Sequence, residues 1–406
     1  MATVRQMLRE TVVRREELDR FLDPHGDCWA MFDPELGYVG HDSRVRDGVD
    51  GAASTYRYEG GGQRKMVNYA NAPCRVNTYG DSFTQCHQVS DGETWQEVLA
   101  AHFGEPVRNF GMGGYGVYQA FRRMVRVERT EAAARYLLLN IFSSDDHYRN
   151  VYAWRWLHMP GWVRNFREKG FTPDESYMFH ANPWAHMKLD LTTGAMVECP
   201  NPYPTRESLY QLCDPMHVYE AFRPNVAVQA FLATQRAEDV DTGLLERAAE
   251  VLNVPCDLSD PDAAARTGQA LLWACALKST FAVLDKARAF AREHGRELMI
   301  LLSYGSGHTE AACEGKERFD QPLLDYLDAN GFRYADSLAA HVRDFGMFNC
   351  TPRQYVRRYY AGHYSPAGNL FFAFAVKDAL VEWLDPRPPA YRPGGDGGRR
   401  LAAGLA

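Results

Sequence analysis

The chain has 406 residues, of which 46% are hydrophobic and 24% are charged, and its formal net charge at pH 7 is −7. The composition is typical of a soluble globular protein, and the length exceeds the usual ~100–200 residues per domain, so we expect one enlarged domain or a domain with an insertion. A general binder of nucleic acid or anionic membranes would present a basic face, so the acidic balance argues against both kinds of partner.

Nine cysteines are spread along the chain without any C-x-x-C pair. The odd number and the spacing disfavour both a disulfide framework and a structural zinc site, and reduced thiols favour a cytoplasmic protein. The N-terminal segment is densely charged and lacks the apolar stretch of a signal peptide. No run reaches the roughly 18 apolar residues of a membrane-spanning helix, so we expect a cytoplasmic location and no membrane partner.

The first part of the chain predicts little regular structure. Residues 1–22 have the pattern of a charged amphipathic helix. Residues 23–70 contain the turn signals DPHGD, FDPELG and EGGGQ and are expected to be irregular. We therefore assign residues 1–70 to an N-terminal helix and an irregular extension.

An alternation of strand and helix signals follows. It consists of a strand at Val76–Tyr79, a helix at Thr94–Phe103 closed by Gly104, a short strand in PVRNFG, a helix at Gln119–Val127, and a buried strand in ARYLLLNIF. This β-α-β-α-β order predicts a parallel sheet with helices on both faces.

The periodicity fades after residue 150. Residues 151–235 are rich in Trp, Tyr, Pro, His and Asn, with a β-hairpin expected around KLDLTTGAMVE, and residues 236–293 read as helical. We interpret residues 151–280 as an inserted mixed or helical subdomain.

Strand and helix patterns typical of an α/β core return near the C-terminus. They are a buried strand at Glu297–Ser303, a helix in PLLDYLDANG, a short strand in FRYADS and a final helix in AGNLFFAFAVKDALVEWL. The α/β core is therefore split between residues 71–150 and residues 281–385. Residues 386–406 are rich in Pro, Gly and Arg and are expected to be disordered.

Chemically useful residues gather where the predicted strands end. Open parallel sheets bind ligands at the carboxyl ends of their strands, and the loops Gly80–Ser82, Asn109–Gly116 and Phe142–His147 leave such ends. The segment YYAGHYSPAGN places His363 just before the final helix. A serine needs a base, usually histidine, to act as a nucleophile, and backbone N–H groups of a glycine-rich turn can hold the developing oxyanion.

Three of these segments carry a family resemblance. YGDSFTQ, NFGMGGYG and GHYSPAGNLFFA resemble, in order, the G-D-S block, the glycine block and the C-terminal histidine block of the SGNH (GDSL-type) hydrolases. The resemblance implies a three-layer α/β/α sandwich with a parallel flavodoxin-like sheet, here enlarged by the insertion. It implies Ser82 as the nucleophile, Gly114 as an oxyanion donor and His363 as the base.

The third block departs from the family pattern. The family asparagine would fall on Asp145 in SSDD. The asparagine donates a hydrogen bond to the oxyanion, whereas an ionised aspartate can only accept one. Asp145 would have to be protonated through a raised pKa, or turned away from the substrate.

The residue at the position of the triad acid also departs from the family pattern. Tyr360 stands three residues before His363, where the family has aspartate. Either the chain uses a Ser82–His363 dyad, or Asp336 or Asp146 supplies the acid, or a backbone carbonyl orients the imidazole.

Each signal also has a structural interpretation. Asp-Ser pairs commonly cap helices, and glycine-rich turns need positive φ. His363 could pack ahead of the final helix, whose expected N-cap is Ser365. The neighbouring Asp145, Asp146 and His147 suggest a metal, but adjacent side chains diverge and no second pair of ligands is present, so we expect no metal and no cofactor.

The function predicted from the sequence is that of a serine esterase. Its partner would be a small-molecule acyl ester, such as an O-acetylated sugar or a short-chain ester, cleaved through an acyl-Ser82 intermediate. Two alternatives stay open: an acyltransferase that uses the same dyad, and a non-catalytic binding protein on the same scaffold.

Overall fold

The computed structural model describes residues 3, 6, 12–154 and 175–392. The chain divides into two compact units, and each is treated by itself. We call residues Met1–Ser43, Gly116–Arg122 and Ser144–Lys286 the helix-rich unit, and Arg44–Tyr115, Arg123–Ser143 and Ala287–Ala406 the sheet unit. Both expected ends of the insertion, residues 151 and 280, fall within the helix-rich unit.

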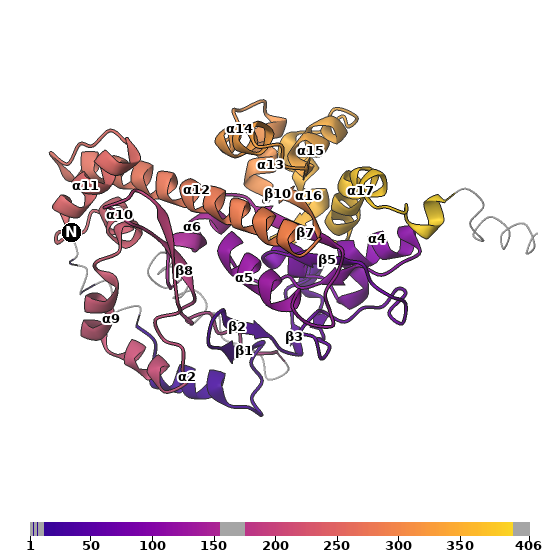
Figure 1. Ribbon diagram of the computed structural model, residues 1–406, viewed down its shortest axis with the longest axis horizontal. Coiled ribbons are helices and arrows are strands. Elements are labelled where there is room, and N and C mark those ends of the chain that lie inside the picture. Colours follow the sequence, from indigo (N-terminus) through magenta and orange to yellow (C-terminus); the bar gives the residue numbers. More distant parts are fainter. Residues whose placement is uncertain (1–2, 4–5, 7–11, 155–174, 393–406) are drawn as a thin grey trace, which may run out of the picture. The chain divides into compact units, whose positions relative to one another are not determined.

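The sheet unit is built on a five-stranded parallel sheet with the order β11-β10-β7-β5-β6, and Figure 1 labels its strands β10, β7 and β5. Its strands are β5 (Val76–Tyr79), β6 (Arg108–Asn109), β7 (Tyr136–Phe142), β10 (Glu297–Ser303) and β11 (Tyr334–Asp336). The central strands β7 and β10 are nearly continuous apolar runs, as expected for strands buried on both faces. All five strands expected from the sequence are confirmed.

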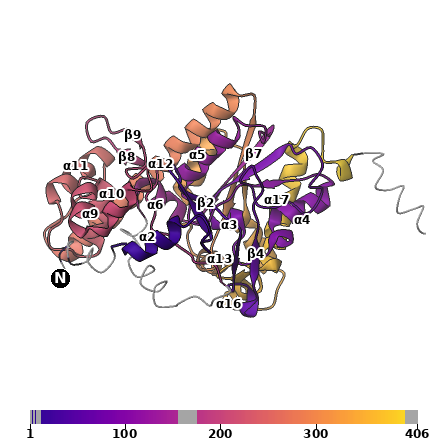
Figure 2. The same cartoon turned by 90° about the horizontal axis from the view of Figure 1, so that it is seen from below.

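One face of the sheet packs against two helices, α4 (Trp95–Phe103) and α17 (Pro366–Trp383), which lie side by side (Figure 2). Thr94 caps α4 by accepting from the backbone N–H of Glu97. Ser365 caps α17, with Pro366 in its first turn. Both helices and the Ser365 cap agree with the sequence-based expectation.

The same unit contains several shorter elements. They are β4 (Ser54–Tyr56), η1 (Val49–Gly51), α3 (Ser82–Gln85), η2 (Asp91–Glu93), α13 (Ser306–Cys313), α14 (Gln321–Ala329), α15 (Ser337–Phe345), α16 (Pro352–Tyr359), β12 (Tyr360–Ala361), β13 (His363–Tyr364) and η4 (Pro389–Tyr391). β12 and β13 form an antiparallel hairpin in which Ala361 pairs with His363. This hairpin follows α16 directly and precedes α17.

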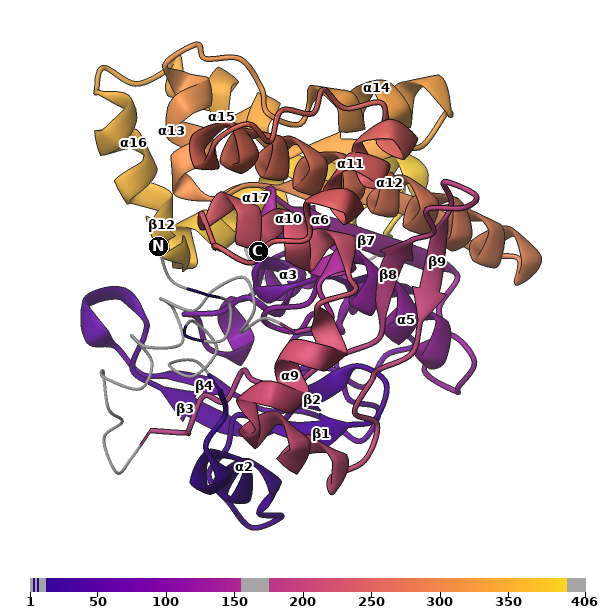
Figure 3. The same ribbon diagram turned by 90° about the vertical axis from the view of Figure 1, so that its left-hand side faces the viewer.

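The helix-rich unit combines helices with two β-hairpins, β1-β2 and β8-β9, both labelled in Figure 3. Its elements are α2 (Arg15–Leu22), β1 (Ala30–Asp33), β2 (Gly37–Gly40), α6 (Asp145–Val151), β8 (His186–Leu189), β9 (Met196–Cys199), η3 (Ser208–Cys213), α9 (Pro215–Phe222), α10 (Val226–Thr234) and α11 (Thr242–Leu252). β8 and β9 confirm the hairpin expected around KLDLTTGAMVE.

Three elements span a boundary between the units: α5 (Val117–Val127), α12 (Pro261–Glu293) and β3 (Ser43–Val45). α12 is 33 residues long, in the region expected to be helical. Among the described residues, no helix combines the length and the apolar character required to cross a membrane.

Two expectations about irregular segments were wrong. Residues 23–70 contain the short strands β1 to β4, because turns such as FDPELG close hairpins rather than interrupt them. In that turn, Asp33 Oδ1 accepts from the backbone N–H groups of Glu35 and Leu36, and Gly37 takes a φ of 82°. Strands of three or four residues are too short to show a clear alternation of apolar and polar residues.

The C-terminal tail is the second case. Residues 386–392 were expected to be disordered, but they include η4, whose Tyr391 ring lies 6.3 Å from the Phe103 ring in an edge-on contact. This aromatic contact anchors the start of the tail. The expected disorder of residues 393–406 concerns residues outside the described part.

Candidate functional site

Ser82 is the first residue of α3, immediately beyond the carboxyl end of β5. Gly80 makes this turn feasible, because a Cβ at that position would lie 2.1 Å from Thr84 Oγ1 and 2.9 Å from the carbonyl oxygen of Asn140. Asp81 caps α3 by accepting from the backbone N–H of Phe83 at 2.9 Å. Ser82 is 8% exposed, and its hydroxyl donates to Asp81 Oδ2 at 3.1 Å.

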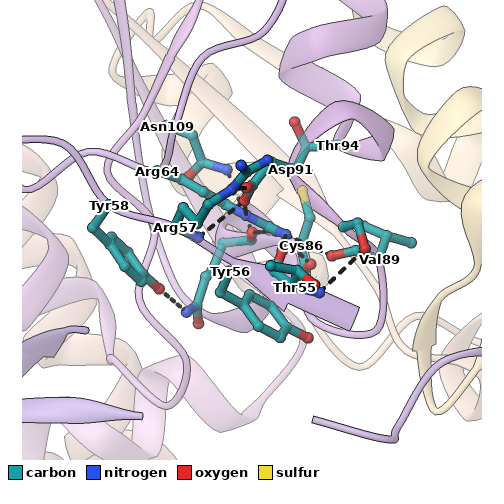
Figure 4. A network of polar contacts seen from close by, with 12 residues as sticks. Thr55, Tyr56, Arg57, Tyr58, Arg64, Cys86, Val89, Asp91, Thr94 and Asn109 are labelled. Atoms are coloured by element: carbon teal, nitrogen blue, oxygen red, sulfur yellow. Dashed lines mark hydrogen bonds and ion pairs between the residues drawn. The ribbon is translucent and has the colours of Figure 1, made fainter. Parts of the chain in front are cut away.

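The segment that follows α3 is fastened by a buried arginine, Arg64 (Figure 4). Its Nε donates to Asp91 Oδ1 at 3.0 Å, and its two terminal nitrogens donate to four backbone carbonyls. These carbonyls belong to Thr55, Gln85, Cys86 and Val89. All five N–H donors of the guanidinium are therefore used, and the backbone around residues 85–91 is held in one shape.

His363 begins β13, and α3 packs against this strand. The imidazole ring lies 5.0 Å from the ring of Phe83, the residue next to Ser82. Gln88 accepts from the backbone N–H of His363 through Oε1, and the same oxygen lies 3.2 Å from His363 Nδ1. Gln88 therefore contacts both the backbone and the side chain of the expected base.

The loop that carries Gly114 also packs against α3. The backbone N–H of Met112 donates to the carbonyl of Gly80 at 3.0 Å, and that of Gly113 donates to Gln85 Oε1 at 2.6 Å. Gly111 approaches α3 so closely that a Cβ there would lie 2.2 Å from the backbone nitrogen of Gln85. Gly114 has a φ of 81°, which suits glycine.

The structure thus brings the Ser82 helix, the Gly114 loop and the His363 hairpin together within the sheet unit. Within the same unit, the Cys86 thiol is buried, and this burial raises its pKa to about 12. Cys86 therefore stays a neutral thiol at pH 7. Burial likewise raises the pKa of the Tyr56 and Tyr364 hydroxyls, which stay protonated.

Asp336, one expected source of the triad acid, is engaged with other groups. Its Oδ1 caps α15 by accepting from the backbone N–H of Leu338 at 2.9 Å. Its Oδ2 lies 2.5 Å from a terminal nitrogen of Arg318, which also pairs with Asp320. Both carboxylate oxygens of Asp336 are therefore bonded to groups other than His363.

Asp145 and Asp146 belong to the helix-rich unit, in the first turn of α6. Both pair with Arg149, Asp145 at 3.2 Å and Asp146 at 3.0 Å. His147 Nδ1 lies 2.7 Å from Thr280 Oγ1. In the part of the chain that the structure describes, no three His, Cys, Asp or Glu side chains are grouped as metal ligands would be.

Two residues that follow Ser82 closely in the chain, His87 and Gln88, were not predicted from the sequence to belong to the site. The backbone N–H of His87 donates to the carbonyl of Ser82 at 3.0 Å, and its ring lies 5.1 Å from that of His363. A Cβ on Gly113 would lie 2.6 Å from His87 Nε2, so this histidine packs against the glycine loop. The one signal in the sequence is that both residues follow Ser82 within a single turn-forming stretch, SFTQCHQ.

The chain matches no protein-family model, and no curated protein shows a significant similarity to it. The functional argument therefore rests on the residues of the site and their geometry.

Proposed function

We propose that the protein is a serine hydrolase of the SGNH type, which cleaves an oxygen ester through an acyl-Ser82 intermediate with His363 as the base. We include in the proposal a three-layer α/β/α sandwich of flavodoxin-like topology. The strand order β6-β5-β7-β10-β11 supports it, because numbering the five strands along the chain gives the order 2-1-3-4-5.

One observation carries the functional proposal. α3, which begins at Ser82, packs against β13, which begins at His363, beside the carboxyl end of β5. A hydroxyl and an imidazole carried by two packed elements at this edge of a parallel sheet are the pair of groups that nucleophilic catalysis requires. The hydrogen bonds of Met112 and Gly113 hold the glycine loop beside the same helix, and Gly114 in this loop is the proposed backbone N–H donor.

In the proposed reaction, Ser82 Oγ attacks the ester carbonyl while His363 Nε2 takes the hydroxyl proton. The backbone N–H groups of Ser82 and Gly114 stabilise the tetrahedral oxyanion. Its collapse breaks the bond to the alkoxy oxygen, and the imidazolium returns the proton to the leaving alcohol. Water then attacks the acyl-enzyme with the same base, which releases the carboxylic acid and restores Ser82.

The hydrogen bond from Ser82 to Asp81 has to break before the proposed reaction begins. The hydroxyl that donates to Asp81 Oδ2 at 3.1 Å must turn toward His363 before attack. The substrate class stays that of small acyl esters, such as O-acetyl or short acyl groups. If an alcohol attacked the acyl-enzyme in place of water, the same residues would act as an acyltransferase.

The test uses a fluorophosphonate and intact-mass analysis of the wild type, Ser82→Ala and Ser306→Ala. Ser306 is a matched control because it also begins a helix, α13, just beyond a parallel strand, β10. We expect one adduct on the wild type and on Ser306→Ala, and none on Ser82→Ala. A folded wild type without an adduct, or an adduct that survives in Ser82→Ala, would refute the proposal and favour the non-catalytic binding protein.

A further inference from the structure

We infer that Gln88 stands in for the triad acid as a positioning residue, holding His363 in the tautomer that carries its proton on Nδ1 and its lone pair on Nε2. The catalytic use of Nε2 rests on the proposed function, whereas the tautomer does not. Gln88 follows Ser82 closely in the chain, far from the position three residues before the histidine where the family has aspartate.

The orientation of the Gln88 amide is fixed by two backbone groups. Its Oε1 faces the backbone N–H of His363, which can only donate, and its Nε2 lies 2.6 Å from the carbonyl oxygen of Asp47, which can only accept. A flipped amide would oppose donor to donor and acceptor to acceptor, so the two ends of the amide are distinguishable here.

The tautomer of His363 follows from that orientation. An amide oxygen has no proton to give, so Oε1 can bond to Nδ1, 3.2 Å away, only if Nδ1 carries the proton. In the neutral imidazole the other nitrogen, Nε2, then carries the lone pair. This is the arrangement a general base needs when it faces a serine.

Gln88 is itself held rigidly. It adopts a left-handed backbone with a φ of 71°, and its N–H donates to the Tyr56 hydroxyl at 2.7 Å. The carbonyls on both sides of it, from Cys86 and Val89, are bonded to Arg64. Its position is therefore set before any ligand binds, which is what a positioning residue requires.

An amide differs from a carboxylate in one respect. It orients the imidazole, but it supplies no negative charge to stabilise the imidazolium that forms during catalysis. The titratable groups around His363 include His87, whose ring is 5.1 Å away, the neighbouring Tyr364, Asp81, which is bonded to Ser82, and Asp47, whose backbone carbonyl holds Gln88. A carboxylate introduced at position 88 would place an acid beside Nδ1.

The first test reads the tautomer directly, without any substrate. Long-range ¹H–¹⁵N correlation spectra of ¹⁵N-histidine-labelled wild type and His363→Gln would assign the His363 ring. We expect the neutral ring to carry its proton on Nδ1. A wild-type ring protonated mainly on Nε2 would overturn the inference, whatever the reactivity of Ser82.

The second test uses Gln88→Met, Gln88→Glu and the control Gln63→Met. We expect Gln88→Met to lose the tautomer preference and to label with fluorophosphonate roughly 10²-fold more slowly. Gln88→Glu should keep the tautomer and move the pH midpoint of labelling upward by about one unit or more, because an anion favours the imidazolium. Gln63→Met removes another buried amide of the sheet unit and should match the wild type.

The outcomes separate the two proposals. Unchanged spectra and labelling rates in Gln88→Met would refute the role of Gln88 while leaving Ser82 as the nucleophile. Absence of labelling in every protein, together with the expected Nδ1–H spectrum, would refute the hydrolase and leave the role of Gln88 in setting the tautomer supported.

Discussion

Arg64 shows how a single buried residue can shape a site that it does not enter. Its side chain is 1% exposed, and it shares Asp91 with Arg57, whose side chain is 49% exposed. The two arginines therefore pair with the same carboxylate, but the Arg64 side chain is buried and the Arg57 side chain is exposed. Arg64 also donates to the backbone carbonyls of Cys86 and Val89, and the desolvation of these carbonyls would be uncompensated without it.

We predict that Arg64→Met lowers the free energy of unfolding by about 3–5 kcal/mol, because removing the buried guanidinium leaves its acceptors without hydrogen-bond donors. Arg57→Met should cost about 1 kcal/mol or less, as exposed ion pairs do. Urea-induced unfolding of both variants at pH 7 checks this. Equal losses would show that the carboxylate pairing, and not the carbonyl contacts, gives Arg64 its effect.

The residues predicted from the sequence and those that were missed differ in the kind of signal they leave. Ser82, Gly114 and His363 stand in short motifs with characteristic neighbours. Gln88 and Arg64 are placed largely by hydrogen bonds to backbone groups, and a contact with a backbone group does not require particular residue types around it. No pattern in SFTQCHQ or EGGGQRK therefore marks them.

At the scale of elements, the strands of the sheet and the capped helices beside it were predictable, and the hairpins β1-β2 and β12-β13 were not. β7 and β10 are mainly apolar strands, and α4 and α17 begin at capping residues, so local sequence determines them. β12 and β13 have two residues each. Tertiary contacts, among them the bond from His363 N–H to Gln88, hold this hairpin, and local preference does not reveal it.

Steric contact between the glycine loop and α3 gives a prediction for Gly111→Ala. The added methyl would meet the backbone of Gln85 and Thr84 at 2.2 and 2.5 Å, and backbone atoms cannot rotate away. We expect a loss of about 1–3 kcal/mol in stability from overpacking, together with slower fluorophosphonate labelling of Ser82.

The control is Gly307→Ala in α13, where an added Cβ meets nothing within 4 Å. This variant should keep the wild-type labelling rate, and its thermal stability should be equal or higher, because alanine favours helices. Wild-type labelling in Gly111→Ala would mean that the loop does not contribute to the site.

At the scale of the whole molecule, neither unit is a continuous stretch of chain. The helix-rich unit uses three segments, and the β1-β2 region is bonded to the stretch around residue 180. The Trp29 indole donates to the carbonyl of Phe179 at 2.9 Å, and the Asn182 amide donates to the carbonyl of Gly37 at 3.1 Å. The sequence could not reveal these pairings, because they join segments about 145–150 residues apart.

We predict that residues 151–280, expressed alone, do not fold cooperatively, because the fragment lacks the β1-β2 partners of its buried groups. Residues 1–286 contain all three segments of the unit and serve as the comparison. Circular dichroism melts and ¹H–¹⁵N spectra would show a broad, non-cooperative change for the short fragment. A sharp melt and dispersed peaks would instead establish an autonomous insertion.

The bond between Gln88 and His363 joins residues 275 positions apart, and this separation has a consequence during synthesis. At about 5–20 residues per second, a ribosome needs roughly 15–55 seconds to pass from one to the other. Throughout that interval the nascent chain carries the serine without its histidine. If Ser82 and His363 act as proposed, reactivity toward esters is withheld until residue 363 has left the ribosome, and chains released before that point are inert.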